Sequence, residues 1–437
     1  MKQTFLHATV IAVTLALAAP AASANEAPGT LLSTSAVPAS EGQRIRYTST
    51  NEVGKIVEVT GALYDTPHAR GLIALAPGTR GMADHCAPSA GVALLSSIEG
   101  DSIGINYEAP LVGELTRAGY RVVVTDYIGL GTPGTHTYLN RIEQGRALID
   151  AARATAKDNE AIAFWGYSQG GGAAAAAAEL VADYAPELDV RATFAGAPPA
   201  DPLAVMQQGT AGMLDTVVGY ATVSYASTYP EFRDALDDYL TEEGHRWLAA
   251  LEHHCITDAP IPHGDILTGG RTLAELALED ERFTRTLNHN KLGQVGVSMP
   301  IMVMTNPDDD LVPAPQAIQL AKDYEAHGSD VTREIVELHG TVSNPLSSLI
   351  APDFEEADAL ARASSYPISN LPVAGHAAPL LFNYGDALEW LAKYMPGKQV
   401  NPGQVAVTTV VAILAVIAAL VPVLAPGFWP AVGRMFT

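Results

Sequence analysis

Residues 166–170 read Gly-Tyr-Ser-Gln-Gly, which places Ser168 in the spacing G-x-S-x-G. An apolar stretch over residues 161–165 precedes this motif, and an alanine-rich stretch over residues 171–180 follows it. The pattern predicts a strand, a sharp turn and a helix, the context that a nucleophile elbow requires. Such a turn strains the backbone of the serine and needs small neighbours, which the glycines supply. Ser168 is therefore the candidate nucleophile, and the alternative is an ordinary serine in a glycine-rich turn.

A serine nucleophile also needs a base and an acid that orients the base. A buried strand predicted over residues 301–304 is followed by Asn-Pro-Asp-Asp-Asp-Leu-Val-Pro at 306–313. Loops at the carboxyl ends of parallel strands are where such sheets place their sites. Asp309 is the candidate acid, while Asp308 and Asp310 are interpreted as solvated turn residues.

Two histidines compete for the role of base. His376 lies in a short Ala-Gly-His-Ala-Ala segment ahead of a helix predicted over residues 386–394, and His339 closes a strand predicted over residues 331–338. A loop before the closing helix favours His376, which would take the proton of the Ser168 hydroxyl and return it to the leaving alcohol.

An oxyanion that forms on an attacked carbonyl needs two backbone N–H donors. One is expected from Gln169, the residue after the serine. The other is expected from the loop Pro-Gly-Thr-Arg-Gly at residues 77–81, which follows a buried strand predicted over 71–76. Within this loop, Arg80 and Gly81 are equal candidates.

The elements that must position these residues alternate between strand and helix patterns. A hairpin is predicted over residues 44–48 and 55–64, buried strands over 121–125 and 191–195, and helices over 110–118 and 141–156. Repeated βα units indicate a mostly parallel sheet covered by helices on both faces. Residues 201–295 interrupt the alternation of strands and helices. Their sequence is helix-forming and apolar, which predicts a cap or lid. A second insertion occupies about 340–370.

The two ends of the chain are expected to lie outside this unit, which we place at residues 43–398. Residues 1–24 have the charge, apolar stretch and small-residue site of a secretory signal peptide, and residues 25–42 read as an extended lead-in. Residues 405–425 are uncharged and long enough for a transmembrane helix. The sequence thus predicts an exported protein anchored in the cell envelope, with its catalytic unit outside the membrane.

Charge, cysteine content and one glycine-rich motif indicate which ligands and cross-links the chain could have. The formal net charge of −23 argues against nucleic-acid binding, which needs clustered Lys and Arg. The two cysteines, Cys86 and Cys255, are expected to form a disulfide in an exported chain. The alternative is a zinc site, because His85 adjoins one cysteine and His253-His254 the other.

Residues 129–134 match G-x-G-x-x-G, the glycine pattern of dinucleotide-binding turns. Its proline and last glycine delay the start of any helix, so a loop that binds no nucleotide is expected.

These motifs together resemble the secretory lipase family of α/β-hydrolases, which includes the yeast lipase A type enzymes. The resemblance rests on segments in family order from about residue 44 to 397: 77–81, 84–89, 126–136, 166–170, 197–201, the turn at Asp309, Gly375-His376 and 387–391. It implies an α/β-hydrolase fold with a helical cap, a triad of Ser168, Asp309 and His376, and hydrolysis of carboxylic esters such as acylglycerols without a cofactor or metal.

The expected protein is thus a membrane-anchored ester hydrolase acting on lipid or other acyl esters. Two alternatives stay open. An acyltransferase would use the same triad and differ only in the nucleophile that resolves the acyl-enzyme. A non-catalytic envelope-binding protein would use a degenerate hydrolase fold.

Overall fold

The computed structural model describes residues 26–37, 40–91, 95–99, 102–208, 213–258, 261, 266–336, 341–342, 366–367, 375–377, 379 and 384–395. The predicted signal peptide, the segment at 405–425 and His339 lie outside these residues. Among the residues that the structure does describe, no helix is both long and apolar enough to cross a bilayer.

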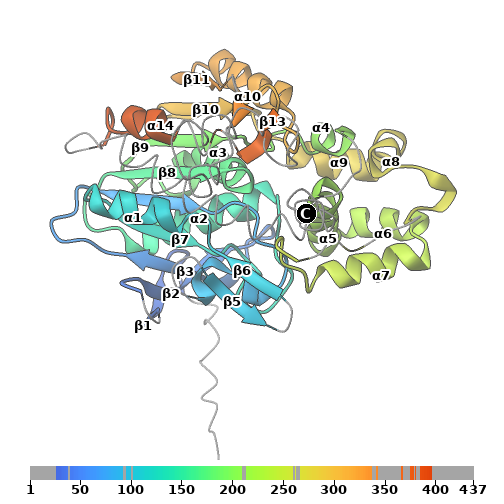
Figure 1. Cartoon of the computed structure of the whole chain (residues 1–437), viewed down its shortest axis with the longest axis horizontal. Helices are drawn as coiled ribbons and strands as arrows, with labels where there is room; N and C mark the ends of the chain where they lie inside the picture. The colour runs from blue at the N-terminus through green and yellow to red at the C-terminus, as the bar shows by residue number, and fades with distance from the viewer. Residues whose placement is uncertain are drawn as a thin grey trace, which may run out of the picture.

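A nine-stranded sheet forms the centre of the molecule, in the order β1-β2-β3-β7-β4-β8-β9-β10-β11 (Figure 1). The first three strands pair antiparallel at one edge: β1 (Leu31–Ala36), β2 (Gln43–Thr50) and β3 (Ile56–Tyr64).

The other six strands run parallel to one another. They are β7 (Arg121–Thr125), β4 (Leu72–Ala76), β8 (Ile162–Tyr167), β9 (Val190–Gly196), β10 (Ile301–Thr305) and β11 (Val331–Ile335).

Helices cover both faces of this sheet, because its central strands alternate apolar side chains between two cores. Leu72 and Ala74 of β4 belong to the core beneath α2 (Arg141–Thr155), α3 (Gln169–Tyr184) and α10 (Ala314–Ala326). Ile73 and Leu75 belong to the core beneath α1 (Ala109–Arg117) and α14 (Tyr384–Leu391). The period of two along β4 thus divides one strand between two cores. The predicted α/β class, with a mostly parallel sheet, is confirmed.

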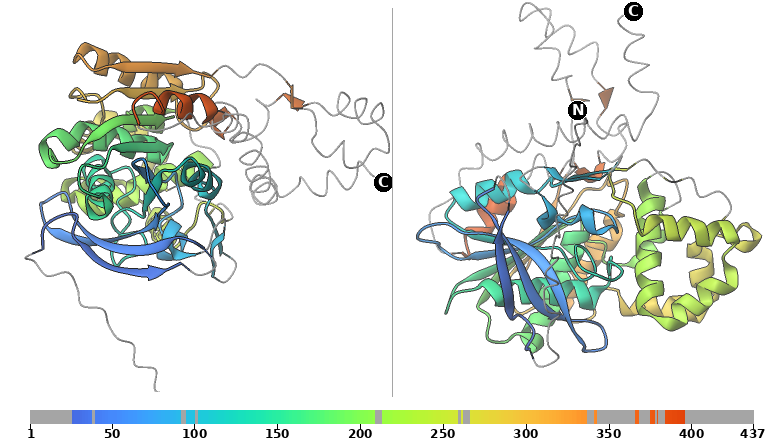
Figure 2. Two further views of the ribbon diagram at one scale, coloured as in Figure 1. Left: turned by 90° about the vertical axis from the view of Figure 1, so that its left-hand side faces the viewer. Right: turned by 90° about the horizontal axis from the view of Figure 1, so that it is seen from below.

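Between β9 and β10 the chain leaves the sheet and forms a group of helices with a core of its own (Figures 1 and 2). These helices are α4 (Pro202–Gln207), α5 (Met213–Thr228), α6 (Pro230–Tyr239), α7 (Glu242–Leu251), α8 (Leu273–Glu279) and α9 (Glu281–His289). Side chains cap several of them: Thr272 and Glu275 form a capping box at α8.

Five short strands were not predicted from the sequence. The lead-in at 25–42 was expected to be extended only, but it contains β1, which pairs with β2 at the sheet edge. A small hairpin, β5 (Leu95–Glu99) and β6 (Ser102–Ile105), precedes α1. The short strands β12 (Thr341–Val342) and β13 (Tyr366–Pro367) pair within the second insertion.

Candidate active site

Ser168 lies in the sharp turn between β8 and α3. Its φ of 59° and ψ of −125° put a non-glycine residue in a region that L-residues seldom adopt. Such strain persists where the surroundings over-determine the conformation, as at functional turns. The backbone of Ser168 is held on both sides, since its N–H donates to the carbonyl of Gly196 at 2.9 Å and its carbonyl accepts from Gly172 at 3.1 Å.

The glycines around Ser168 are required by close backbone contacts. A Cβ on Gly166 would lie 2.0 Å from the carbonyl oxygen of Gly170, and a Cβ on Gly170 would lie 2.0 Å from that of Ala76. A Cβ on Gly171 would meet the carbonyl of Gly196 at 2.1 Å. The turn and the start of α3 therefore pack directly against the ends of β4 and β9. Only glycine permits backbone segments to approach this closely.

Asp309 and His376 form a buried pair at the carboxyl end of β10. The His376 Nδ1 lies 2.9 Å from Oδ2 and 3.1 Å from Oδ1 of Asp309, and both residues are buried. Asp309 Oδ1 also accepts the N–H groups of Leu311 at 2.9 Å and Val312 at 2.7 Å. The carboxylate is thus fixed by its own turn and points its second oxygen at the imidazole.

The environment of His376 favours its charged form. Burial by itself lowers the pKa of this imidazole, but the charge and hydrogen bond of Asp309, together with the charge of Asp310, outweigh burial and raise the pKa above its usual value. Asp310 was expected to be only a solvated turn residue. It is exposed, yet its Oδ1 accepts the backbone N–H of His376 at 3.0 Å.

The segment that carries His376 is also bonded to Tyr167 at the end of β8 and to Asn306 just after β10. Asn306 Nδ2 donates to the carbonyl of Gly375 at 2.6 Å, and the Tyr167 hydroxyl donates to the carbonyl of His376 at 2.6 Å. The rings of Tyr167 and His376 lie 5.4 Å apart between centroids. Because Tyr167 directly precedes Ser168, the imidazole lies beside the serine turn.

The loop at 77–81 leaves β4 next to the same turn. Its Gly78 N–H donates to Glu108 Oε1 at 2.7 Å, so this amide has a partner within the protein. Arg80 and Gly81, the two predicted donors, lie further along the loop. The Arg80 side chain is buried and paired with Glu108, and the Arg80 carbonyl accepts the N–H of Ile256 at 2.8 Å. Gly81 lies opposite Cys255 in an antiparallel bridge.

The G-x-G-x-x-G segment forms a loop, since α2 begins only at Arg141. It leads to His136, a fully buried residue whose Nε2 lies 3.1 Å from the side-chain nitrogen of Gln169. Burial lowers the pKa of His136 to about 4, so the ring is neutral near pH 7 and its Nε2 accepts from the Gln169 amide. This loop therefore supports the residue after the candidate nucleophile.

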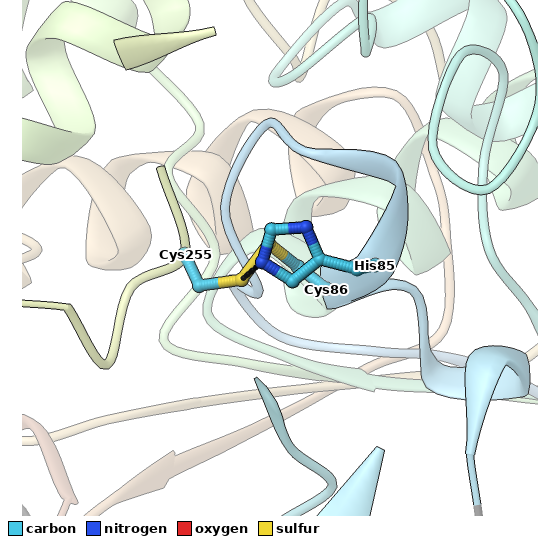
Figure 3. A group of neighbouring side chains, drawn as sticks. All are labelled: His85, Cys86 and Cys255. Atoms are coloured by element: carbon cyan, nitrogen blue, oxygen red, sulfur yellow. Dashed lines mark hydrogen bonds between the residues drawn. A yellow bond between two sulfur atoms is a disulfide. The ribbon is translucent and has the colours of Figure 1, made fainter. Parts of the chain in front are cut away.

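Cys86 and Cys255 form a disulfide with an S–S distance of 2.01 Å, as the cysteine count predicts (Figure 3). The bond joins the segment after the 77–81 loop to the segment after α7. His85 Nε2 lies 3.2 Å from Cys255 Sγ. These three residues are the set within the described chain that could converge on a metal ion, but disulfide sulfurs carry no thiolate for zinc. His254 is not part of this set, and its Nδ1 contacts the Tyr220 hydroxyl at 2.6 Å.

A cavity of about 510 Å³ lies beside His85, the neighbour of Cys86. The residues that line it come from the 82–85 segment, the β5–β6 hairpin, the loop before α2 and the end of α7: Met82, Ala83, Asp84, His85, Ser102, Gly134, Thr135, His136, Glu252 and His253.

The sequence was compared with known protein families and with curated proteins. The sequence profile of the secretory lipase family matches residues 95–403. A protein of Mycobacterium tuberculosis named a probable inactive lipase is 27% identical over 255 residues, which cover 55% of this chain and 55% of that protein. A secreted triacylglycerol lipase of Malassezia furfur is 26% identical over 265 residues, 56% of this chain and 66% of that one. The chain thus spans between about half and two thirds of the length of these relatives.

Solved structures share the fold. Candida antarctica lipase A in its closed state superimposes with a TM-score of 0.64 at 17% identity, covering 88% of this chain and 91% of that one. The rice cell wall degrading esterase LipA of Xanthomonas oryzae gives 0.58 at 20% identity, covering 72% and 92%. These likenesses confirm the α/β-hydrolase fold.

Proposed function

Because the chain belongs to the secretory lipase family, we propose that it is an exported serine hydrolase of carboxylic esters. The observation that carries this proposal is the buried contact of 2.9 Å between His376 Nδ1 and Asp309 Oδ2, beside the turn that holds Ser168. A carboxylate on Nδ1 leaves Nε2 as the basic nitrogen, which is the tautomer that a serine nucleophile needs.

In the proposed reaction, the Ser168 oxygen attacks the ester carbonyl while His376 Nε2 takes its proton. The resulting imidazolium is stabilised by the Asp309 carboxylate, and the proton passes to the alcohol as the C–O bond of the ester breaks. Water then attacks the acyl-enzyme, His376 takes a proton from that water, and the acid is released as the proton returns to Ser168.

The negative charge on the carbonyl oxygen is assigned to two backbone donors. One is the N–H of Gln169 at the start of α3, where the aligned peptide dipoles also favour an anion. The other belongs to the 77–81 loop. Arg80 and Gly81 remain the candidates, and Gly78 is set aside because its N–H already donates to Glu108.

The substrate class that we propose is an acyl ester with an apolar chain. The helices between β9 and β10 have a core of their own, and the Cys86–Cys255 bond joins the segment after α7 to the segment that follows the 77–81 loop. This arrangement suits a cap that covers the acyl chain and excludes water during the reaction. We further propose export through residues 1–24 and anchoring through residues 405–425, which would bring the enzyme to lipid or glycolipid esters of the cell envelope.

A non-catalytic protein is the second candidate, and one observation favours it. A relative at 27% identity carries the name of a probable inactive lipase. Against it stand the contact of His376 with Asp309 and the strained turn at Ser168, which support the proposed triad. An acyltransferase would share all three, so only its products would reveal it.

The test is hydrolysis of p-nitrophenyl esters from acetyl to palmitoyl by the full chain, with Ser168→Ala, Asp309→Asn and His376→Ala as variants. We expect hydrolysis that Ser168→Ala and His376→Ala abolish, together with labelling by a fluorophosphonate that Ser168→Ala removes. Folded protein that neither hydrolyses any ester nor takes the label would support the non-catalytic candidate. Acyl transfer to an added alcohol in excess of hydrolysis would support the acyltransferase.

A further inference from the structure

The loop at 77–81 is held by three consecutive residues, Asn106, Tyr107 and Glu108, which directly precede α1. Glu108 Oε1 accepts the N–H of Gly78 at 2.7 Å, and the Tyr107 hydroxyl donates to the carbonyl of Thr79 at 2.8 Å. We call residues 106–108 the loop anchor. Its contacts reach successive residues of the loop, so they fix the path of the backbone and not only one side chain.

The side chain of Arg80 brings a third set of contacts to the loop anchor. The guanidinium forms an ion pair with Glu108, donates to Asn106 Oδ1 at 3.0 Å and lies 3.7 Å from the centroid of the Tyr107 ring. Only 2% of the Arg80 side chain is exposed. A buried charge that loses its partner costs several kcal/mol, so this pairing strongly opposes any rearrangement of the loop.

The fit between the loop and its anchor is also steric. A Cβ on Gly78 would lie 2.5 Å from the Tyr107 hydroxyl oxygen, so a side chain there would force the loop or Tyr107 to shift. The Tyr127 hydroxyl in turn donates to the carbonyl of Pro77 at 2.7 Å. Two tyrosine hydroxyls therefore bond to backbone carbonyls of the loop.

These bonds divide the polar groups of the loop into two sets. The carbonyls of Pro77, Thr79 and Arg80 and the amide of Gly78 have partners. Throughout the described parts of the chain, the amides of Thr79, Arg80 and Gly81 have none. Fixed and unpaired N–H groups next to a serine turn are what an oxyanion donor requires, because donors aimed in advance need no reorganisation during the reaction.

We propose that Tyr107 and Glu108 are positioning residues for the reaction at Ser168. They act through the 77–81 loop, whose remaining amides they hold toward the oxyanion, and they do not touch the substrate. This proposal rests on the proposed ester hydrolysis. It assigns a role to a segment that carries no motif in the sequence.

The test compares Tyr107→Phe, Glu108→Gln and Glu108→Ala in the full chain with the wild type on p-nitrophenyl butyrate. We expect kcat to fall about tenfold in Tyr107→Phe and about a hundredfold in Glu108→Ala, since complete loss of one oxyanion donor costs about 10² to 10³. Glu108→Gln keeps an oxygen for the Gly78 amide and should recover part of the loss. KM should change little in Tyr107→Phe, because the ester in its ground state carries no oxyanion.

Inhibition by an alkyl trifluoromethyl ketone distinguishes a loss of oxyanion positioning from a general loss of folding. The ketone reacts with Ser168 to give a tetrahedral oxyanion, which uses the same backbone donors. Its inhibition constant should rise by the factor by which kcat/KM falls, whereas inhibition by butyrate, the product acid, should not change. Two variants away from the loop are matched controls. Tyr184→Phe removes a hydroxyl that donates to Thr50, and Glu160→Gln removes the carboxylate of a buried ion pair with Arg121. Both should keep the wild-type kcat.

Wild-type kcat in Tyr107→Phe and Glu108→Gln would overturn the proposal, and so would a loss of rate without weaker ketone binding. These two mild variants decide the matter if Glu108→Ala does not fold. A wild type that hydrolyses no ester would instead overturn the proposed function, and the positioning role with it.

Discussion

The hydroxyl of Tyr167 donates a hydrogen bond of 2.6 Å to the carbonyl of His376, across 209 positions of the sequence. Tyr167 ends β8 and directly precedes Ser168, while His376 contacts Asp309 beyond the end of β10. One buried hydroxyl therefore ties the segment carrying the proposed base to the strand carrying the proposed nucleophile. This contact, together with the bonds from Asn306 and to Asp310, sets the relative placement of the two.

Removal of that hydroxyl should impair catalysis more than folding. We expect Tyr167→Phe to lower kcat on p-nitrophenyl esters by about tenfold, because small misplacements of a base reduce the rate steeply. Thermal unfolding should show a loss of about 1 kcal/mol, the usual net contribution of one buried hydrogen bond. A variant with wild-type kcat and reduced stability would show that Tyr167 serves the fold alone.

The pH dependence of hydrolysis should reflect the carboxylates around His376. The base must be neutral to accept a proton, so activity should fall as the pH falls through its raised pKa, above the usual 6.5 for histidine. Asp310→Asn removes one of the charges that raise this pKa and keeps an oxygen for the His376 N–H. The acid limb of the kcat/KM profile should therefore move to lower pH in Asp310→Asn. An unmoved limb would mean that another group controls it.

His136 should make stability depend on pH. Its folded pKa of about 4 lies below the unfolded value near 6.5, so the unfolded chain binds the proton first. Stability from this group is complete above pH 6.5 and is lost as the pH falls toward 4, by about 3 kcal/mol in total. We expect His136→Gln, followed by denaturant unfolding at pH 7 and pH 4.5, to show a smaller loss between the two pH values than the wild type. An equal loss in both would contradict the assignment.

The same histidine should affect activity through Gln169. His136→Phe retains a ring between Tyr127 and Tyr138 but leaves the Gln169 side-chain amide without its acceptor. An unsatisfied buried amide costs about 1–3 kcal/mol, and the start of α3 should relax to satisfy it. We expect a lower kcat with little change in KM. Gln169→Leu removes the donor itself and should restore part of the stability in the double variant.

The Cys86–Cys255 bond should contribute mainly to stability. It spans a sequence separation of 169, and closing a loop of that size in the unfolded chain is worth about 5 kcal/mol in the chain-entropy description. Cys86→Ala with Cys255→Ala should lower the unfolding temperature markedly. Activity should fall as well, because Gly81, which lies opposite Cys255, is the last residue of the loop that we assign to the oxyanion. Full activity in the double variant would show that this pairing survives without the covalent bond.

The sequence by itself determined most of the strands and helices of the central sheet and the residue types available for chemistry. Local patterns suffice for this, because period-two and period-3.6 alternation is set by which face of each segment is buried. The apolar run over residues 71–76 predicted β4, and G-x-S-x-G predicted the strained turn at Ser168. The role of the triad residues stays a prediction, and His339, the alternative base, lies outside the described residues.

Only the tertiary structure decided which groups support the site. Tyr167, His136, Tyr107 and Glu108 carry no motif of their own in this role, since a tyrosine in a strand or a glutamate before a helix has many ordinary uses. Their contacts join segments from about 30 to more than 200 positions apart, and such partners are chosen by how the sheet and helices pack. Alternation along one segment holds no information about that choice, so a single sequence supplies the reacting groups but not what holds them in place.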